Sequence, residues 1–231
     1  MRYVGGVDEA GRGSMIGPLV VAGICIEESR LDRLKELGVK DSKKLSHERR
    51  EFLFPKILEI SDFTYVIKID CETIDKNVVQ KRLNILEART MASIIKNLNA
   101  DIVYVDSCDV NPQRFHDNIV SNIEGKKPMI YSLHKAENIS IVVASASIVA
   151  KVLRDEEIGK INEKYGNDVG SGYPSDKKSI DFVRKLLRDS RQVPNFIRKS
   201  WKPVKMMREN SSPQCSTITD YLFSNVQYIK P

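Results

Sequence analysis

The sequence is poor in cysteine and histidine, and the few that it has show no metal-ligand spacing. Its four cysteines, Cys25, Cys71, Cys108 and Cys215, include no Cys-x-x-Cys pair. This spacing argues against a zinc site and against a disulfide framework. We therefore expect reduced thiols, as in a cytoplasmic protein.

Long apolar runs and internal repeats are also missing. No run approaches the ~18 residues that a membrane-spanning helix needs, and the start of the chain shows no signal-peptide pattern. These absences predict no membrane partner. The 231 residues, of which 41% are hydrophobic, suffice for one large globular domain or two small ones.

Acidic residues are scarce in one segment, which concentrates the positive charge of the chain. The net charge is +6, yet the segment from Lys177 to Arg208 holds eleven basic residues against Asp181 and Asp189, a local charge of +9. Such a basic stripe is typical of nucleic-acid binders. The plain alternative is a solvated helical face.

The most informative motif lies near the start of the chain, where an apolar strand is expected to run into a glycine-rich turn. Asp8 and Glu9 lie where this strand should stop, and Gly11, Arg12 and Gly13 follow. Paired carboxylates suit Mg²⁺, glycines let the backbone approach a ligand closely, and an arginine can meet a phosphate. Taken alone, an ordinary acidic turn is an equal alternative.

Apolar periodicity predicts a mixed sheet with helices packed against it. The expected strands cover residues 3–9, 17–26, 63–70, 101–106 and 129–132. The expected helices cover residues 29–37, 47 onward with a kink or break at Pro55, 79–98, 111–123, 142–165 and 176–188, with a further helical stretch near Trp201. The short connection before residue 101 predicts a crossover and a parallel strand pair.

Asp106 closes the fourth expected strand, at the end where open α/β sheets place ligands. It is therefore a candidate metal ligand, and the alternative is a helix cap or turn former. Past Lys205 the sequence turns polar and serine-rich, which predicts a flexible linker.

Six motifs in a fixed order resemble one family, the type 2 ribonucleases H (ribonuclease HII), in an archaeal-looking form. They are DEAGRG (8–13), DSKKL (41–45), LNILEA (83–88), VDS (105–107), ASIVAKVLRD (146–155) and GYPSD (172–176). The resemblance implies a ribonuclease H-like fold, an α/β mixed five-stranded sheet flanked by helices with a helical C-terminal extension. The catalytic domain would be residues 1–205, with its core to about residue 165 and the basic extension at 166–205.

The activity that the resemblance implies is endonucleolytic cleavage of RNA paired with DNA, including a lone ribonucleotide inside duplex DNA. The products would carry a 5′-phosphate and a 3′-hydroxyl. Two Mg²⁺ or Mn²⁺ ions, ~4 Å apart, would activate a water and stabilise the leaving oxygen. Clustered carboxylates agree with this chemistry, because a bound cation removes the cost of their mutual repulsion.

By the same resemblance, Asp8, Glu9, Asp106 and Glu137 are the catalytic metal ligands. A regular strand would point Asp8 and Glu9 to opposite faces, so both reach one site only if the strand ends or bends at Glu9. Glu137 stands where the family usually has an aspartate, and its extra methylene puts the second metal site and the preferred metal in doubt. In the alternative, Glu137 is a surface residue and Asp155 or water fills the role.

The resemblance also implies a substrate-binding set. Backbone groups of Gly11, Arg12 and Gly13 would sense the 2′-hydroxyl that separates RNA from DNA, and Tyr173 would pack against the sugar at the RNA–DNA junction. Lys43 would contact a phosphate. The alternatives are a partly buried core tyrosine and a plain surface lysine. The basic segment would contact the duplex backbone and set affinity.

Residues 206–231 are expected to form a flexible tail. Within it, Ile218, Tyr221 and Leu222 have i, i+3, i+4 spacing and resemble a sliding-clamp-binding peptide. The usual glutamine would fall at Cys215, and the alternative is a helix that docks on its own domain.

Two other functions compete with the nuclease. One is a catalytically silent module that binds RNA/DNA hybrids, against which the retained acidic residues argue. The other is another ribonuclease H-like nuclease, such as a junction resolvase, against which the Gly-Arg-Gly and Gly-Tyr-Pro motifs argue.

Overall fold

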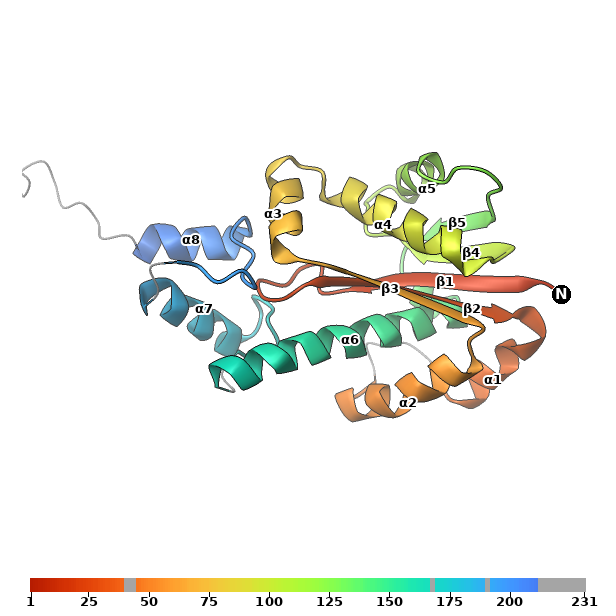
Figure 1. Ribbon diagram of the computed structural model, residues 1–231, viewed down its shortest axis with the longest axis horizontal. Helices are drawn as coiled ribbons and strands as arrows, with labels where there is room; N and C mark the ends of the chain where they lie inside the picture. Colours follow the sequence, from red (N-terminus) through yellow and green to blue (C-terminus); the bar gives the residue numbers. More distant parts are fainter. Residues whose placement is uncertain (40–44, 167–168, 190–191, 212–231) are drawn as a thin grey trace, which may run out of the picture.

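The structure is a computed structural model that describes residues 1–39, 45–166, 169–189 and 192–211. A five-stranded sheet lies between two layers of helices, and two further helices extend from the end of the sheet opposite the N-terminus (Figure 1). No helix within these ranges is long and apolar enough to cross a membrane.

The sheet has the strand order β3-β2-β1-β4-β5. Its strands are β1 (Tyr3–Ala10), β2 (Leu19–Glu27), β3 (Phe63–Ile69), β4 (Ile102–Asp106) and β5 (Met129–Leu133). Strands β1, β2 and β3 pair antiparallel, whereas β4 pairs parallel with both β1 and β5. The predicted mixed sheet and the predicted parallel pair are therefore confirmed, and β1 lies at the centre.

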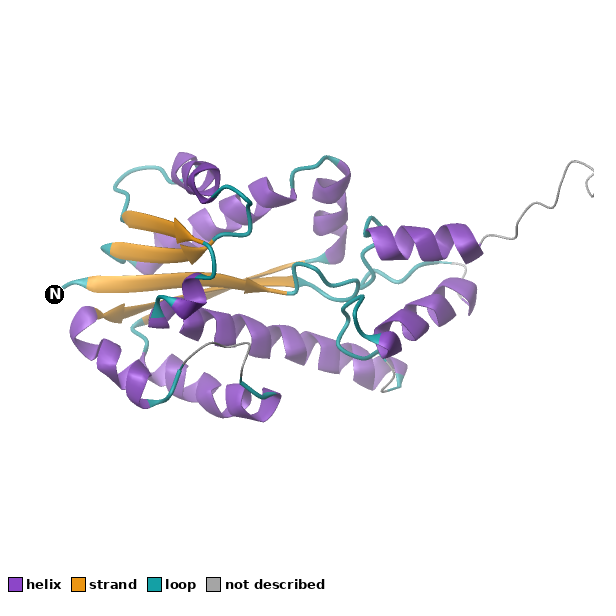
Figure 2. Ribbon diagram, turned by 180° about the vertical axis from the view of Figure 1, so that it is seen from behind, coloured by secondary structure: helices purple, strands orange, loops and turns teal. Residues whose placement is uncertain are grey.

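Helices cover both faces of the sheet, as Figure 2 shows from behind. One face carries α3 (Cys71–Val79), α4 (Leu83–Leu98) and α5 (Pro112–Ser121), and the other carries α1 (Leu31–Glu36), α2 (His47–Ile60) and α6 (Ile141–Tyr165). Short 3₁₀ turns are η1 (Glu28–Arg30) and η3 (Ala136–Asn138). Alternation along β1 sends Val7 into the α4 core and Val4 into the α6 core.

Helix α6 packs unusually close to β1 because β1 has a glycine there. A Cβ atom on Gly6 would lie 2.3 Å from the carbonyl carbon of Val142, so only glycine permits this approach. The long helix therefore passes directly beneath the strand that carries Asp8.

The helix expected at residues 79–98 begins only at Leu83, and the separate helix α3 before it was not expected. Helix α3 ends at Val79 and α4 begins at Leu83, with Lys81 in a left-handed conformation (φ 57°) between them. The sequence signal for α3 is its N-cap, since the Asp70 carboxylate accepts a hydrogen bond from the backbone N–H of Thr73. At Pro55 the sequence predicts either a kink or a break, and the structure shows no break, because α2 continues through Pro55 to Ile60.

The C-terminal extension is built from α7 (Lys177–Asp189) and α8 (Lys202–Ser211). Helix α8 continues past Lys205, where the sequence predicts a flexible linker. The extension has its own apolar cluster, formed by Met15, Ile16, Ile158, Val169, Phe182, Val183, Ile197 and Val204. This cluster includes residues that follow β1, so the extension is attached directly to the glycine-rich turn.

Candidate active site

Asp8 and Glu9 lie inside β1, which pairs regularly with β2 up to Ala10. The expectation that the strand ends at Glu9 is therefore wrong. Asp8 points toward α6, where Ser147 and Lys151 are its neighbours, and Glu9 points toward the α4 side. The two side chains thus face opposite layers, as alternation requires.

Asp106 is the carboxylate that both side chains share. It ends β4, which lies beside β1 with Val7 opposite Val105, and its charge acts on both Asp8 and Glu9. Its Oδ1 accepts a hydrogen bond from the backbone N–H of Ala136 at 2.7 Å. The first three predicted carboxylates therefore gather at the ends of two neighbouring strands.

Glu137 follows Ala136 in the short turn η3, next to the end of β4. Its side chain is buried, with 4% exposed, so the surface alternative for this residue is wrong. The hydrogen bond between Asp106 and Ala136 fixes this turn against the carboxylate cluster.

The electrostatics of the cluster are unfavourable as they stand. Burial, and then the charge of Asp106, raises the pKa of Asp8 to about 7, although Ser147 and Lys151 oppose the rise. Burial, and then Asp8, raises the pKa of Glu9 well above its usual value. Within the described ranges, Glu9 Oε2 is buried with no hydrogen-bond partner.

A divalent cation fits this donor set. The candidates are all carboxylate oxygens, which Mg²⁺ and Mn²⁺ accept. A cation would offset both the burial and the repulsion that raise the two pKa values. In the part of the chain that the structure describes, no three or more His, Cys, Asp or Glu side chains are already arranged to hold a metal. The side chains would therefore have to adjust on binding.

The glycine-rich turn that follows β1 is joined to Tyr173. The backbone N–H of Gly11 donates to the Tyr173 hydroxyl at 3.1 Å. Gly11 has φ +89°, and a Cβ atom on it would lie 2.8 Å from the Pro18 carbonyl oxygen, so a larger residue would be both strained and crowded. The turn and the tyrosine, far apart in sequence, thus form one surface.

Tyr173 is half-buried, and an arginine side chain packs against the face of its ring. The guanidinium of Arg154 lies 4.6 Å from the ring centre, within the range of a cation–π contact. Arg154 also donates to the Ser14 hydroxyl at 3.0 Å and to the Ser171 carbonyl. These contacts orient the Tyr173 hydroxyl toward the turn.

The Arg12 side chain is turned toward α4. Its Nε donates to Glu87 Oε2 at 3.1 Å and its Nη2 to Asn84 Oδ1 at 2.7 Å. Asn84 and Glu87 are one helical turn apart and so present both oxygens on one face of α4. In this arrangement Arg12 fixes the turn, and its guanidinium is already engaged.

Comparison with known proteins connects this arrangement to one family. A family model described as Ribonuclease HII matches residues 5–204. The ribonuclease HII of Cenarchaeum symbiosum is 44% identical over 202 residues, which cover 87% of this chain and 96% of that protein. This chain belongs to the ribonuclease HII family. Its members are metal-dependent endonucleases with ribonuclease H activity on RNA/DNA hybrids, and the chain is such an enzyme.

Two solved structures agree with this assignment. The ribonuclease H2 of Pyrococcus horikoshii OT3 superposes with a TM-score of 0.84 at 37% identity, covering 92% of this chain and 100% of that one. A ribonuclease HII of Archaeoglobus fulgidus, solved as a complex with PCNA, gives a TM-score of 0.79 at 40% identity, covering 87% and 95%. The ribonuclease H-like fold expected from the motifs is therefore confirmed.

Sequence reasoning missed one residue of this ribonuclease HII that contacts the turn directly. Arg198 is fully buried, although it lies in the basic segment that was expected to contact a duplex. Its guanidinium donates to the carbonyls of Arg12 and Gly17. Charge alone gave no signal for this difference, because Arg198 stands among basic residues whose side chains are exposed, namely Lys177, Lys178, Arg184, Lys185, Arg188, Lys199, Lys202, Lys205 and Arg208.

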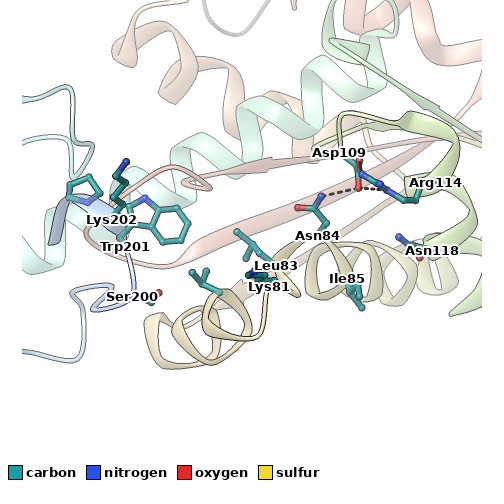
Figure 3. A pocket seen from close by; sticks show the side chains of 12 residues that line it. Lys81, Leu83, Asn84, Ile85, Asp109, Arg114, Asn118, Ser200, Trp201 and Lys202 are labelled. Carbon is teal, nitrogen blue, oxygen red and sulfur yellow. Dashed lines mark hydrogen bonds and ion pairs between the residues drawn. The ribbon is translucent and has the colours of Figure 1, made fainter. Parts of the chain in front are cut away.

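A cavity of about 830 Å³ opens beside the turn, between the α3–α4 junction, α5 and the start of α8 (Figure 3). Asn84, Asp109 and Arg114 line one side, with Asn84 donating to Asp109 at 2.9 Å. Trp201 and Lys202 line the opposite side. Asn84 thus connects the cavity wall to the Arg12 side chain.

Four of the predicted residues cannot be placed. Lys43, Ile218, Tyr221 and Leu222 lie outside the described residues, so their roles stay predictions.

Proposed function

We propose that this ribonuclease HII also cuts at the 5′ side of single ribonucleotides embedded in duplex DNA, leaving a 5′-phosphate and a 3′-hydroxyl. The observation that carries the proposal is the contact between Gly11 N–H and the Tyr173 hydroxyl. Gly11 comes two residues after Glu9, one of whose carboxylate oxygens is buried with no partner among the described residues. A polar group that can read one ribose thus lies next to the groups that would act on its phosphate.

Asp8, Glu9, Asp106 and Glu137 would hold two Mg²⁺ or Mn²⁺ ions. The support is the all-oxygen donor set, the raised pKa values of Asp8 and Glu9, and the Glu9 oxygen that has no partner in the described chain. When bound, two such cations supply an activated water and stabilise charge on the leaving oxygen.

The residues of the chain itself hold these carboxylates in place. The Ser147 hydroxyl hydrogen-bonds to Asp8 and the Lys151 charge favours its ionised form. The Ala136 N–H fixes Asp106, and Glu137 follows in the same turn. This support limits how far the carboxylates can move apart, despite their repulsion.

Substrate choice would come from backbone groups of the turn. Because the guanidinium of Arg12 is engaged by α4, its contribution to recognition lies in its peptide groups, together with those of Gly11 and Gly13. A 2′-hydroxyl can both donate and accept, so peptide groups can sense it. Tyr173 would pack against the adjoining sugar, and Lys43 and the exposed basic residues would contact phosphates.

The test is cleavage of a DNA duplex that contains one ribonucleotide, in Mg²⁺ or Mn²⁺. We expect the wild type to cut it once and Asp8→Asn to cut it at least ~1,000-fold more slowly, while the exposed control Asp32→Asn keeps wild-type activity. An uncut duplex, or equal cutting by Asp8→Asn, contradicts the proposal. Cutting of an all-DNA duplex would identify another kind of nuclease, and binding without cutting would identify a silent module.

We further propose that the tail, residues 206–231, binds a sliding clamp through Ile218, Tyr221 and Leu222. The support is their spacing and the Archaeoglobus fulgidus relative that was solved with PCNA. Deleting residues 213–231 should abolish clamp binding and spare cleavage of short duplexes. Loss of that cleavage would instead indicate a tail that docks on residues 1–205, the proposed catalytic unit.

The cytoplasm is the compartment that we propose for this activity. The support is cysteine chemistry, since Cys25, Cys71 and Cys108 are free thiols within the described residues.

A further inference from the structure

Arg198 is the bulkiest of the fully buried side chains, and its surroundings are unusual for an arginine. No carboxylate lies within ion-pair distance of it in the described part of the chain. Burying a cation without such a partner is costly unless hydrogen bonds compensate. Hydrogen-bond acceptors around the guanidinium therefore have to compensate for its burial.

The acceptors are two main-chain carbonyls at the two ends of one turn. Nη1 of Arg198 donates to the Arg12 carbonyl at 2.9 Å, and Nε and Nη2 donate to the Gly17 carbonyl at 3.1 and 3.0 Å. The planar guanidinium thus spans residues 12 to 17. A lysine has one point of donation and cannot span both carbonyls in this way.

Neighbouring bonds attach the same turn to the extension. The backbone N–H of Arg198 donates to the Met15 carbonyl at 2.9 Å, and the indole N–H of Trp201 donates to the Gly13 carbonyl at 3.2 Å. On the other side, Met15 N–H donates to the Gly172 carbonyl at 2.8 Å. The turn therefore lies between the loop that carries Tyr173 and the segment that leads into α8.

We propose that Arg198 is a positioning residue that fixes the peptide groups of Gly11 to Gly13 and thereby sets the selectivity for ribonucleotides. This proposal rests on the proposed function, since it assumes that these peptide groups read the 2′-hydroxyl. The extension then has two tasks. Its exposed cations contribute affinity for the duplex, while the buried Arg198 shapes the recognition element.

Arg198 can affect selectivity because a recognition site tolerates only small displacements of its peptide groups. A displacement of about 1 Å in a positioning element can cost ~100-fold in rate. Without the guanidinium, the carbonyls of Arg12 and Gly17 lose their shared donor, and the peptide group between Arg12 and Gly13 is held by fewer hydrogen bonds. The ribose would then be read less accurately, whatever the affinity for the duplex backbone.

The first test compares Arg198→Lys with its exposed neighbour variant Lys199→Ala on the single-ribonucleotide duplex. We expect Arg198→Lys to lower kcat/KM by ~30–100-fold, mainly through kcat. Lys199→Ala should raise KM by ~2–5-fold with kcat unchanged, because the exposed Lys199 is expected to contact a phosphate. A loss in Arg198→Lys that lies only in KM overturns the proposal.

The second test separates positioning from simple destabilisation. In an Asp8→Asn background, binding is measured for two duplexes that differ only by one 2′-hydroxyl. Arg198→Lys should bring the ratio of the two dissociation constants close to 1, whereas Lys199→Ala should weaken both equally. Partial unfolding lowers the active fraction and leaves the ratio unchanged, so an unchanged ratio overturns the proposal.

If Arg198→Lys does not fold, Trp201→Phe takes its place, because it removes the bond to the Gly13 carbonyl and replaces the ring that lies 5.2 Å from the Arg198 guanidinium with a smaller one. In this variant the ratio of the dissociation constants of the two duplexes should move ~3-fold toward 1, and an unchanged ratio again overturns the proposal. A wild type that does not cut the ribonucleotide duplex contradicts the proposed function itself. A wild type that cuts it, with selectivity retained in the variant, contradicts only the role of Arg198.

Discussion

The end of β1 and the turn directly after it are adjacent in sequence and opposite in how their polar groups are satisfied. Asp8 is buried and Glu9 is half-buried, both beside like charges, and one oxygen of Glu9 has no partner among the described residues. In the turn, by contrast, the carbonyls of Arg12, Gly13 and Gly17 all accept hydrogen bonds from the extension. A bound cation would therefore stabilise the carboxylates at the end of β1, whereas these carbonyls of the turn already have their hydrogen-bond donors.

This difference indicates that the two regions have different roles. The turn is held rigid before substrate binds, and the carboxylates repel one another until a cation binds. A recognition element profits from being fixed before the substrate arrives, because its ordering then costs nothing on binding. A metal site can remain costly in the free enzyme, because binding of the cation returns that free energy.

The largest effect should appear in the stability of the metal-free protein. Asp8 has a folded-state pKa of about 7 against 3.8 in the unfolded chain. Between these values the folded state binds more protons, so the free energy of unfolding falls as pH rises through this window. We expect a loss of about 2–4 kcal/mol between pH 4 and pH 8, measured by urea unfolding with a chelator present.

Asp8→Asn is the control for this prediction. It should be more stable than the wild type at pH 8 and nearly equal to it at pH 4, since it cannot acquire the charge. Adding Mg²⁺ should restore much of the lost stability of the wild type and little of the variant's. A wild type whose metal-free stability rises toward pH 8 would show that the carboxylates do not repel as the structure indicates.

A second, smaller effect should appear when the turn is distorted. Gly11→Ala places a Cβ atom at φ +89° and 2.8 Å from a carbonyl oxygen, so it should cost about 1–3 kcal/mol of stability. The matched control is Gly13→Ala, whose Cβ meets nothing within 4 Å. It should change thermal unfolding little. Equal destabilisation by the two variants would mean that the turn is less fixed than its hydrogen bonds suggest.

Much of the fold could be predicted from the sequence because strands alternate and end at recognisable residues. The five strands, the parallel pairing of β4 and the position of Asp106 at its end all follow from local pattern. The break between α3 and α4 did not follow, because Val79 and Leu83 fit one continuous apolar helical face. The Asp70 N-cap and the positive φ of Lys81 outweigh that pattern.

The sequence predicts which residues form the site better than it predicts how their side chains are oriented. Motifs located Asp8, Glu9 and Tyr173, but the orientation of Arg12 depends on α4, and α4 reaches it only in three dimensions. Arg198 shows the same limit most clearly. A buried arginine and an exposed one have identical side chains, and only their neighbours decide which carbonyls or phosphates they meet.

The smallest effect should sharpen this last contrast within the basic segment. Lys185 is exposed on α7, and Lys185→Ala should raise KM by ~2–3-fold and reduce the slope of log affinity against log salt by about 1. Its control, Lys35→Ala, lies on α1 at the opposite end of the molecule and should leave that slope unchanged (Figure 1). Equal slopes for both variants would remove α7 from the duplex-binding surface. Contact with the duplex would then fall to the exposed cations beyond α7, such as Lys199 and Lys202.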